Sequence, residues 1–303
     1  MPYIILWYLM WRSLELSYWL TLALAIPTVG FLVRIFIIFH DCGHGSFFAS
    51  QKHNHLWGIL TGVLTFTPYY RWRHDHAIHH ACAGNLDRRG VGDVKTLTTH
   101  EYLELPAWQK LAYRIMRQPL VMFTIGAAGV FLVAHRFGRK GLSKRERDSV
   151  VWTNLALAGI AALMSALIGF KAYVLIQLPV MMLAATTGVW LFYVQHNFEG
   201  TYWVRREQWD FVQAGLKGSS YYKLPKLLQW FTGNIGFHHI HHLGPRIPNY
   251  LLEKCHKENP VFQVPSLSFG RSLKSLLYRL WDEDAQRMVG FRIRRRKAFG
   301  GLR

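Results

Sequence analysis

The chain has 303 residues, of which 51% are hydrophobic and only 17% are charged, and its formal net charge is +19. Soluble domains carry about 25% charged residues, so this composition excludes an ordinary soluble protein and indicates a membrane protein. A charge this basic also occurs in nucleic-acid-binding proteins, but here the lysines and arginines gather beside apolar stretches, as in the cytoplasmic loops of membrane proteins, and we expect no nucleic-acid partner.

The first eleven residues are apolar, but Arg12 follows them at once. A helix of eleven residues is about 16 Å long, which is about half of the membrane core. We therefore expect a truncated first transmembrane helix, one that should begin earlier than this chain does. A secretory signal peptide is the competing interpretation, and it fails because no basic region precedes the apolar stretch and no small-residue cleavage site follows it.

Three longer apolar segments are expected to cross the membrane. They cover residues 17–39, 150–169 and 172–195, and each has about the 20 residues that a crossing requires. Arg34 lies inside the first of them, near its end, where a long side chain can reach the lipid headgroups.

Three histidine clusters stand at or beyond the ends of these apolar segments. A histidine followed by another three or four residues later lies on the same side of a helix, so each cluster can present its imidazoles together. Neutral imidazole is a common ligand of iron, zinc and copper, and eight ligands suit a pair of ions better than one. The eight are His40, His44, His76, His79, His80, His238, His241 and His242.

The other histidines and the cysteines are expected to have no direct role in metal binding. His74 and His239 lie within clusters but off the repeated spacing, and five more, His53, His55, His100, His135 and His256, lie outside any ligand spacing. Cys42 and Cys82 adjoin histidine clusters, so a ligand role has to be considered, but a small buried thiol is the favoured interpretation. Cys255 completes an odd number of cysteines without zinc-binding spacing.

The clusters must lie on one side of the membrane if they share one site. Residues 56–70 and 119–134 are apolar but short or interrupted by glycine, and we predict that neither crosses. The basic loop 136–147 should be cytoplasmic. The expected fold is an all-α integral membrane protein, a single domain over residues 1–303, with four transmembrane helices in two hairpins and a cytoplasmic helical cap that carries the histidines.

With these motifs the sequence resembles the membrane-bound di-iron fatty acid desaturases. The resemblance rests on the histidine clusters and on their surroundings, and it runs from about residue 14 to about residue 290. It is strongest toward bacterial acyl-lipid desaturases of the bacillus-type phospholipid and delta-12 kinds. The segments that carry this narrower likeness are 39–44, 84–90, 193–196 and 233–242.

The resemblance implies further site residues and cofactors. His196 matches a ninth ligand of the family, and the metals would be two iron ions, with O2 as co-substrate. Asp41 and Glu199 adjoin ligands, and each either accepts an imidazole N–H or is a plain solvated carboxylate. Asp87 and Asp93 are weaker candidates for the same task. Asn234 is expected to hold a metal-bound water.

The resemblance also implies an activity and partners. The expected activity is insertion of a double bond into a membrane-lipid acyl chain at the inner membrane, with electrons from an acidic ferredoxin- or flavodoxin-like donor attracted by the basic surface. The chain would lie in an apolar tunnel lined by aromatic residues near the clusters: Tyr69, Tyr70, Trp72, Trp230 and Phe237. A lipid or carotenoid hydroxylase or ketolase remains an alternative. A histidine-rich metal transporter fits less well, because transporter sites usually lie near the membrane midplane.

Overall fold

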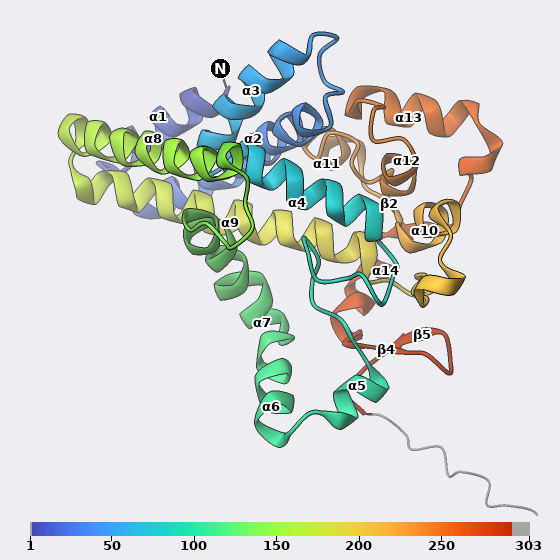
Figure 1. Ribbon diagram of the computed structural model, residues 1–303. Helices are drawn as coiled ribbons and strands as arrows, with labels where there is room; N and C mark the ends of the chain where they lie inside the picture. The colour runs from blue at the N-terminus through green and yellow to red at the C-terminus, as the bar shows by residue number, and fades with distance from the viewer. Residues whose placement is uncertain (1, 293–303) are drawn as a thin grey trace, which may run out of the picture.

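The computed structural model describes residues 2–292, and they form a predominantly helical protein (Figure 1). Two helices of 27 residues, α2 and α9, run through its centre, and α1, α8 and the segment that begins with α7 lie along them. The main elements are α1 (Pro2–Ser13), α2 (Tyr18–His44), α3 (Gln51–Leu64), α4 (Tyr69–Cys82), α5 (Thr99–Glu104), α6 (Ala107–Met116), α7 (Pro119–Val121), α8 (Lys144–Ile168), α9 (Phe170–His196), α10 (Phe211–Gly218), α11 (Lys226–Phe231), α12 (His238–Leu243), α13 (Asn249–Glu258) and α14 (Phe269–Ser272).

The strands are short and belong to the polar cap. One sheet has the order β1 (Leu97–Thr98), β4 (Leu280–Asp282), β5 (Arg287–Val289), with β1 parallel and β5 antiparallel to β4. The other pairs β2 (Tyr221–Lys223) with β3 (Ser266–Ser268) in parallel. These sheets fasten the chain that follows α9 to the rest of the cap.

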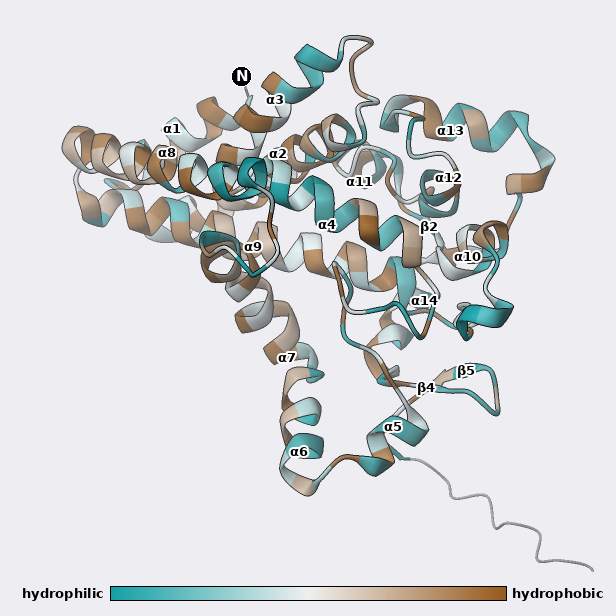
Figure 2. Ribbon diagram, viewed as in Figure 1, coloured by the Kyte–Doolittle hydropathy of each residue, from teal (hydrophilic) through white to brown (hydrophobic). Residues whose placement is uncertain are grey.

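The three strongly apolar segments form α2, α8 and α9, as predicted. Each of these helices is long and apolar enough to cross a membrane. At 1.5 Å per residue, α2 and α9 are about 40 Å long, so they exceed a membrane core of about 30 Å and carry their last turns beyond it. Figure 2 shows the outcome: α8 and α9 are largely apolar, whereas α4 and α12 are largely hydrophilic.

Short connections fix the ends of these helices. Gly169 alone joins α8 to α9, with a φ of +87° that favours glycine. Gly45, with a φ of +69°, ends α2 directly after His44; its N–H donates to the carbonyl of Cys42, and the N–H of Ser46 donates to the carbonyl of Asp41. Both turns follow from glycines that the sequence places at the ends of apolar segments.

One more segment than predicted is long and apolar enough to cross a membrane. A fourth stretch that is long and apolar enough to span is Pro119–Arg136, which was predicted not to cross. It begins with α7 and continues through π-helical turns at Met122–Gly126 and Gly129–Val133 and a 3₁₀ turn at Ala134–Arg136. By contrast, α1 has only 12 residues, too few for a full crossing.

Both ends of the 119–136 stretch are tied to the same half of the helix bundle. Before it, Arg117 lies 3.4 Å from the hydroxyl of Tyr193, in the last turn of α9. At its end, Arg136 donates to the Asn154 side chain over 2.8 Å, in the first half of α8. Because α8 runs away from the histidine end of the bundle and α9 returns to it, these contacts favour a stretch that enters and leaves on one side.

The segment between the first two histidine clusters also returns to its starting point. Helix α3 has 14 residues, about 21 Å and too short to cross, and the ring centroids of His44 and His76 are 4.9 Å apart. Residues 45–75 therefore begin and end at one site, in agreement with the predicted non-spanning character of 56–70. The sequence also has a basic run near its end, formed by Arg292 and residues 294–297, and residues 294–297 lie outside the described residues.

This topology predicts which positions share a side of the membrane. Cysteines placed at Lys140 and Glu207, both exposed, are expected to react with an impermeant thiol reagent from the cytoplasmic side. A cysteine at Lys171, in the α8–α9 turn, should react only from the opposite side. The labelling is measured in inverted and right-side-out vesicles with Cys255 replaced by serine. Labelling of positions 140 and 207 from opposite sides would show that the topology is wrong.

Candidate metal centre

The ends of four helices bring the histidine clusters together. His40 and His44 lie at the end of α2, and His196 is the last residue of α9. The second cluster lies in the last turns of α4, and the third makes up most of the short helix α12, toward which the ends of α4 and α9 run (Figure 1). The apolar helices α2 and α9 carry their histidines in their last turns, and the hydrophilic helices α4 and α12 bring theirs to the same place.

The nine predicted histidines form two separate groups. In each group the imidazole nitrogens lie within 4.8 Å of one another. The five-histidine group consists of His40, His44, His76, His80 and His241, and the four-histidine group consists of His79, His196, His238 and His242. Among the described residues, no cysteine or carboxylate joins either group.

Each of the two His-x-x-His-His clusters places two of its histidines in one group and the third histidine in the other group. His76 and His80, four residues apart, stay together, while His79 joins the other group. His238 and His242 likewise stay together, and His241 crosses over. At about 100° per residue, positions i and i+4 differ by only about 40° around a helix, whereas i+3 lies about 60° to the other side. Each cluster therefore supplies both groups.

Within each group, Nε2 atoms face one another at close range. In the five-histidine group the Nε2 atoms of His40 and His76 and those of His76 and His80 are 3.1 Å apart, and the distance from His80 to His241 is 3.0 Å. In the four-histidine group the Nε2 of His196 lies 3.1 Å from that of His79 and 3.0 Å from that of His238, and His238 is 3.1 Å from His242.

The outer ring nitrogens determine which atoms carry the protons. The Nδ1 of His79 lies 2.5 Å from a carboxylate oxygen of Asp93, and the Nδ1 of His196 lies 3.1 Å from the carbonyl of Gly218. Both partners are acceptors, so a neutral imidazole places its proton on Nδ1 and a lone pair on Nε2. The Nε2 atoms of His79 and His196, 3.1 Å apart, then point their lone pairs at each other. Because the two lone pairs repel, this arrangement needs a cation between them.

The histidines outside the membrane-spanning helices are held in the neutral form. Burial, strengthened by the neighbouring imidazoles, keeps the pKa of His238, His241 and His242 well below the ordinary value of histidine. The same causes lower the pKa of His76 and His80. Neutral imidazole is the form that binds metal.

The spacing of the nitrogens fits metal ions. Imidazole nitrogen binds a first-row metal such as zinc at about 2.1 Å, so two nitrogens at right angles around one ion are about 3.0 Å apart, and two at a tetrahedral angle are about 3.4 Å apart. The six observed distances of 3.0–3.1 Å favour right angles, the octahedral pattern. His44 adds a buried Nε2 without a hydrogen-bond partner. These residues fit one ion in each group.

Each group contains one histidine whose orientation is fixed by a carboxylate. Asp41 lies 3.0 Å from the Nδ1 of His40, as predicted, and Asp93 serves His79. Burial raises the pKa of Asp93, but the hydrogen bond from His79, the electrostatic effects of His79 and His196 and the N–H of Gly90 together keep the pKa below the usual value. Asp93 was the weaker candidate because it lies 14 residues beyond its histidine on an irregular loop.

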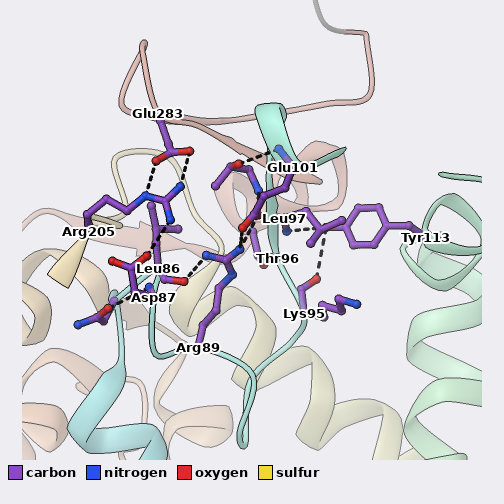
Figure 3. A network of polar contacts seen from close by, with 12 residues as sticks. Leu86, Asp87, Arg89, Lys95, Thr96, Leu97, Glu101, Tyr113, Arg205 and Glu283 are labelled. Carbon is purple, nitrogen blue, oxygen red and sulfur yellow. Dashed lines mark hydrogen bonds and ion pairs between the residues drawn. The ribbon is translucent and has the colours of Figure 1, made fainter. Parts of the chain in front are cut away.

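Asp87 has a different role from the one predicted. It pairs with Arg205 at 2.7 Å, and Arg205 also pairs with Glu283 at 2.8 Å (Figure 3). In the same network Arg89 pairs with Glu101. These ion pairs hold the start of the loop that carries Asp93 against the cap. Asp87 therefore contributes to the site only by helping to position this loop.

The structure does not bring the side chains of Glu199 and Asn234 into contact with the histidine groups. Glu199 is exposed, and the carbonyl of Gly218 accepts from His196 in its place. Asn234 uses its side chain within the protein, accepting from Gln229 at 2.7 Å and donating to the carbonyl of Asn249 at 2.9 Å. Both polar atoms of this side chain thus make contacts away from the histidine groups.

Two further histidines and one cysteine, expected to have no direct role in metal binding, lie apart from the groups. His74 is half exposed and pairs with Glu146 at 2.9 Å. The Nε2 of His239 lies 3.0 Å from the carbonyl of Phe262. Cys42 is packed with Phe39 and Tyr69 in an aromatic cluster. All three side chains support neighbouring structure.

An apolar cavity of about 350 Å³ opens onto both groups. His40 and His76 of one group and His238 of the other line it. Along α9 the lining extends from Met181 to Gln195, about 21 Å at the rise of an α-helix. The cavity therefore leads from the histidines into the membrane-spanning part of the protein.

The predicted aromatic lining is only partly present. Trp72 lines the cavity and stacks on His76 with ring centroids 4.3 Å apart. Tyr69 and Phe237 are instead buried in separate clusters, and Trp230 lies half exposed over Arg34. Tyr70 also lies outside the lining, under Arg145. Phe36, Phe131 and Phe192 line the cavity in their place.

Comparisons with known proteins agree with this geometry. The family model described as "Fatty acid desaturase" matches residues 17–266. The "Fatty acid desaturase" of Bacillus subtilis (strain 168) is 51% identical over 292 residues, which are 96% of this chain and 83% of that protein. The "sn-1 acyl-lipid omega-3 desaturase (ferredoxin)" of Nostoc sp. (strain 36) is 26% identical over 82% of this chain and 69% of its own length.

Plant relatives are longer than this chain. The "Omega-3 fatty acid desaturase, endoplasmic reticulum" of Nicotiana tabacum is 27% identical over 245 residues, 74% of this chain but only 60% of that protein. The matched region thus spans less than two thirds of this relative.

Replacing single histidines should distinguish the metal ligands from nearby histidines that do not bind metal. We expect His76→Ala to lose bound metal, because His76 contacts two other nitrogens of its group at 3.1 Å. His74→Ala, two residues away, should retain the wild-type metal content, since His74 faces Glu146. Metal per chain is measured by elemental analysis of purified protein. Equal losses in the two variants would contradict the division between the groups and their surroundings.

Asp93→Asn should weaken the four-histidine group alone. Loss of the carboxylate that orients His79 is expected to reduce metal affinity by about 10- to 100-fold, the usual effect of removing such a partner. Competition with a chelator measures the affinity. Asp87→Asn, six residues earlier in the chain, is the control and should bind both ions nearly as tightly as the unmodified protein. A loss of both ions in Asp93→Asn would contradict this assignment.

Proposed function

The chain belongs to the fatty acid desaturase family, and from this premise we propose that it inserts a double bond into an acyl chain of a membrane lipid, using O2, two electrons and two irons held by the nine histidines. It is an oxidoreductase of the membrane. The observation that carries the proposal is the apolar cavity that opens onto both histidine groups.

The cavity has the character that a hydrocarbon chain requires. Apart from the histidines, its walls are mostly aliphatic and aromatic side chains from α2, α9 and the 119–136 stretch. An acyl chain lying in it would lose its contact with water and gain dispersion contacts, which favours binding. His40 and His238 would then stand beside the methylene groups to be oxidised.

Iron is the metal that the family and the donor set favour together. Removing two hydrogens from an unactivated methylene pair is beyond any side chain, and two bound irons would supply the dioxygen activation that the reaction needs. Imidazole suits iron as well as zinc and copper, and the desaturase family favours iron among them. The protein's own contribution is to fix the imidazoles, keep them neutral and exclude water from the reacting carbons.

A lipid-linked acyl chain fits the cationic surroundings of the cavity. Asp75 and His135 line its polar part, and Arg139 pairs with Asp75. Arg71 approaches the same carboxylate at 3.9 Å, and Arg136 is the residue next to His135. This excess of positive charge suits a lipid phosphate. The name of the Nostoc relative also specifies an acyl-lipid substrate.

An acidic protein is the electron donor that best suits the chain. Its formal net charge of +19 would attract such a donor over distance. Two relatives, from Nostoc and from Arabidopsis thaliana, carry "(ferredoxin)" in their names. We propose a ferredoxin- or flavodoxin-like donor acting from the cytoplasmic side.

Lipid analysis of an expressing host tests the proposed reaction. In a bacterium without such lipids, the iron-loaded protein and a ferredoxin system should produce lipid acyl chains lighter by two hydrogens, and fragmentation should give one double-bond position. A gain of one oxygen would identify a hydroxylase instead. Unchanged lipids, with two irons bound, would overturn the proposal. His238→Ala serves as the inactive control.

Filling the cavity should block the substrate and spare the metal. Gly188 lines the cavity, and a Cβ there would meet no atom within 4 Å. We expect Gly188→Leu to lower product formation at least about tenfold, because the acyl chain is displaced from the irons. Gly159→Leu is the control, since Gly159 lies exposed on α8 with equal room. Equal activity of the two variants, at equal iron content, would contradict the role of the cavity.

A further inference from the structure

A continuous chain of hydrogen bonds runs from His40 to a charged cluster on the surface. His40 is hydrogen-bonded to Asp41, and Asp41 to Asn249 in the first turn of α13. The remaining links join Asn249 to Asn234 in the turn after α11, Asn234 to Gln229, and Gln229 to Glu253. Every contact in it is between 2.7 and 3.0 Å. Segments more than 200 residues apart in the sequence are joined by this path.

The inner part of the chain fixes the carboxylate of Asp41. One oxygen accepts from the Nδ1 of His40, and the other accepts both the backbone N–H and the side-chain amide of Asn249, at 2.7 and 2.8 Å. Asn249 is the first residue of α13, so the carboxylate also receives an unpaired N–H at a helix start, where negative charge is favoured. Asp41 is only 2% exposed, so it has little contact with solvent.

The middle part fixes Asn249. The backbone carbonyl of Asn249 accepts a hydrogen bond from the side-chain amide of Asn234. The side-chain oxygen of Asn234 in turn accepts a hydrogen bond from Gln229. Asn234 has a φ of +59°, a left-handed conformation that asparagine tolerates better than most residues. Glycine would adopt this backbone more easily, but it would have no amide to join Gln229 to Asn249.

The outer part anchors Gln229. The nitrogen of its amide carries two hydrogens and donates one to Asn234 and the other to Glu253, at 2.8 Å. Glu253 in turn pairs with Lys226 at 2.5 Å and Lys257 at 2.8 Å. These hydrogen bonds lower the pKa of Glu253 to about 2, so it remains a charged acceptor throughout the physiological range.

We propose that Asn249, Gln229 and Glu253 are positioning residues that hold His40 in its metal-binding orientation, so that the surface cluster controls affinity in the five-histidine group alone. The inference rests on the proposed metal site. The amides leave no path for a proton to be relayed, and the chain acts as a rigid brace. Each residue of the chain is held by a hydrogen bond to its neighbour, so removal of one link loosens the next.

The four-histidine group does not share this brace. His79 depends on Asp93, whose second oxygen receives only the backbone N–H of Gly90 at 3.3 Å. His196 depends on a backbone carbonyl. Loosening the Asn249 chain should therefore affect one ion and leave the other in place.

Iron competition with a chelator tests the proposal on the full chain in detergent. Asn249→Ala should bind one of two irons about tenfold more weakly, as expected for a lost partner of a ligand. Glu253→Ala should weaken the same iron to a smaller degree. Glu253→Gln should restore most of the affinity, because its amide oxygen can accept the same hydrogen bond from Gln229.

Glu258→Ala is the matched control. Glu258 is a second glutamate of α13, is largely exposed, and lies 3.9 Å from Lys254, so its removal should change neither iron. A double variant, Asn249→Ala with Asp93→Asn, should weaken both irons independently.

Four results separate the possible failures. If the unmodified chain binds no iron, both the proposed function and this inference fail. If it binds two irons and Asn249→Ala loses both equally, or Glu253→Ala matches Glu258→Ala, the brace alone is overturned. A double variant that weakens only one iron would also overturn it. Melting temperatures of the metal-free variants identify any general loss of fold.

Discussion

Nine imidazoles, seven of them buried and two partly buried, with nitrogens that face one another, are the constraint on which the rest of the structure depends. Lone pairs at 3.0–3.1 Å repel unless a cation lies between them. The protein holds them in place by fixing outer nitrogens with Asp41, Asp93 and the carbonyl of Gly218. Two metal ions would turn this repulsion into attraction. We therefore expect metal binding to be coupled to the folding of the cap.

The membrane segments follow from the same constraint. Helices α2 and α9 each have 27 residues, so they cross a membrane core and still extend far enough to present histidines beyond it. Helices α4 and α12 then bring the remaining ligands to the same end. The segments 45–75 and 117–136 must return to the side from which they start, and their contacts with the site end of the bundle are consistent with this. In the proposed reaction, an acyl chain in the cavity along α9 would lie between the membrane and the metals.

Much of this arrangement could be predicted from the sequence, because helix periodicity and membrane length are local rules. The spacing of His76, His79 and His80 indicated metal ligands, but not that His79 leaves its neighbours for the second group. His196 has no spacing signal, and only the family resemblance pointed to it. Glu199 and Asn234 were assigned from adjacency, which fails where a helix ends and the path of the chain depends on tertiary contacts. Asp93 and Asn249 reach the site through such contacts, and no local pattern marks them.

The account requires two ions in two histidine groups rather than one ion in a shared cage. Anomalous diffraction at the iron edge, on crystals of the iron-loaded chain, locates the metals directly. The account predicts two peaks, one among the Nε2 atoms of His40, His44, His76, His80 and His241 and one among those of His79, His196, His238 and His242. A single peak between the groups, or iron bound away from these nitrogens, would contradict it.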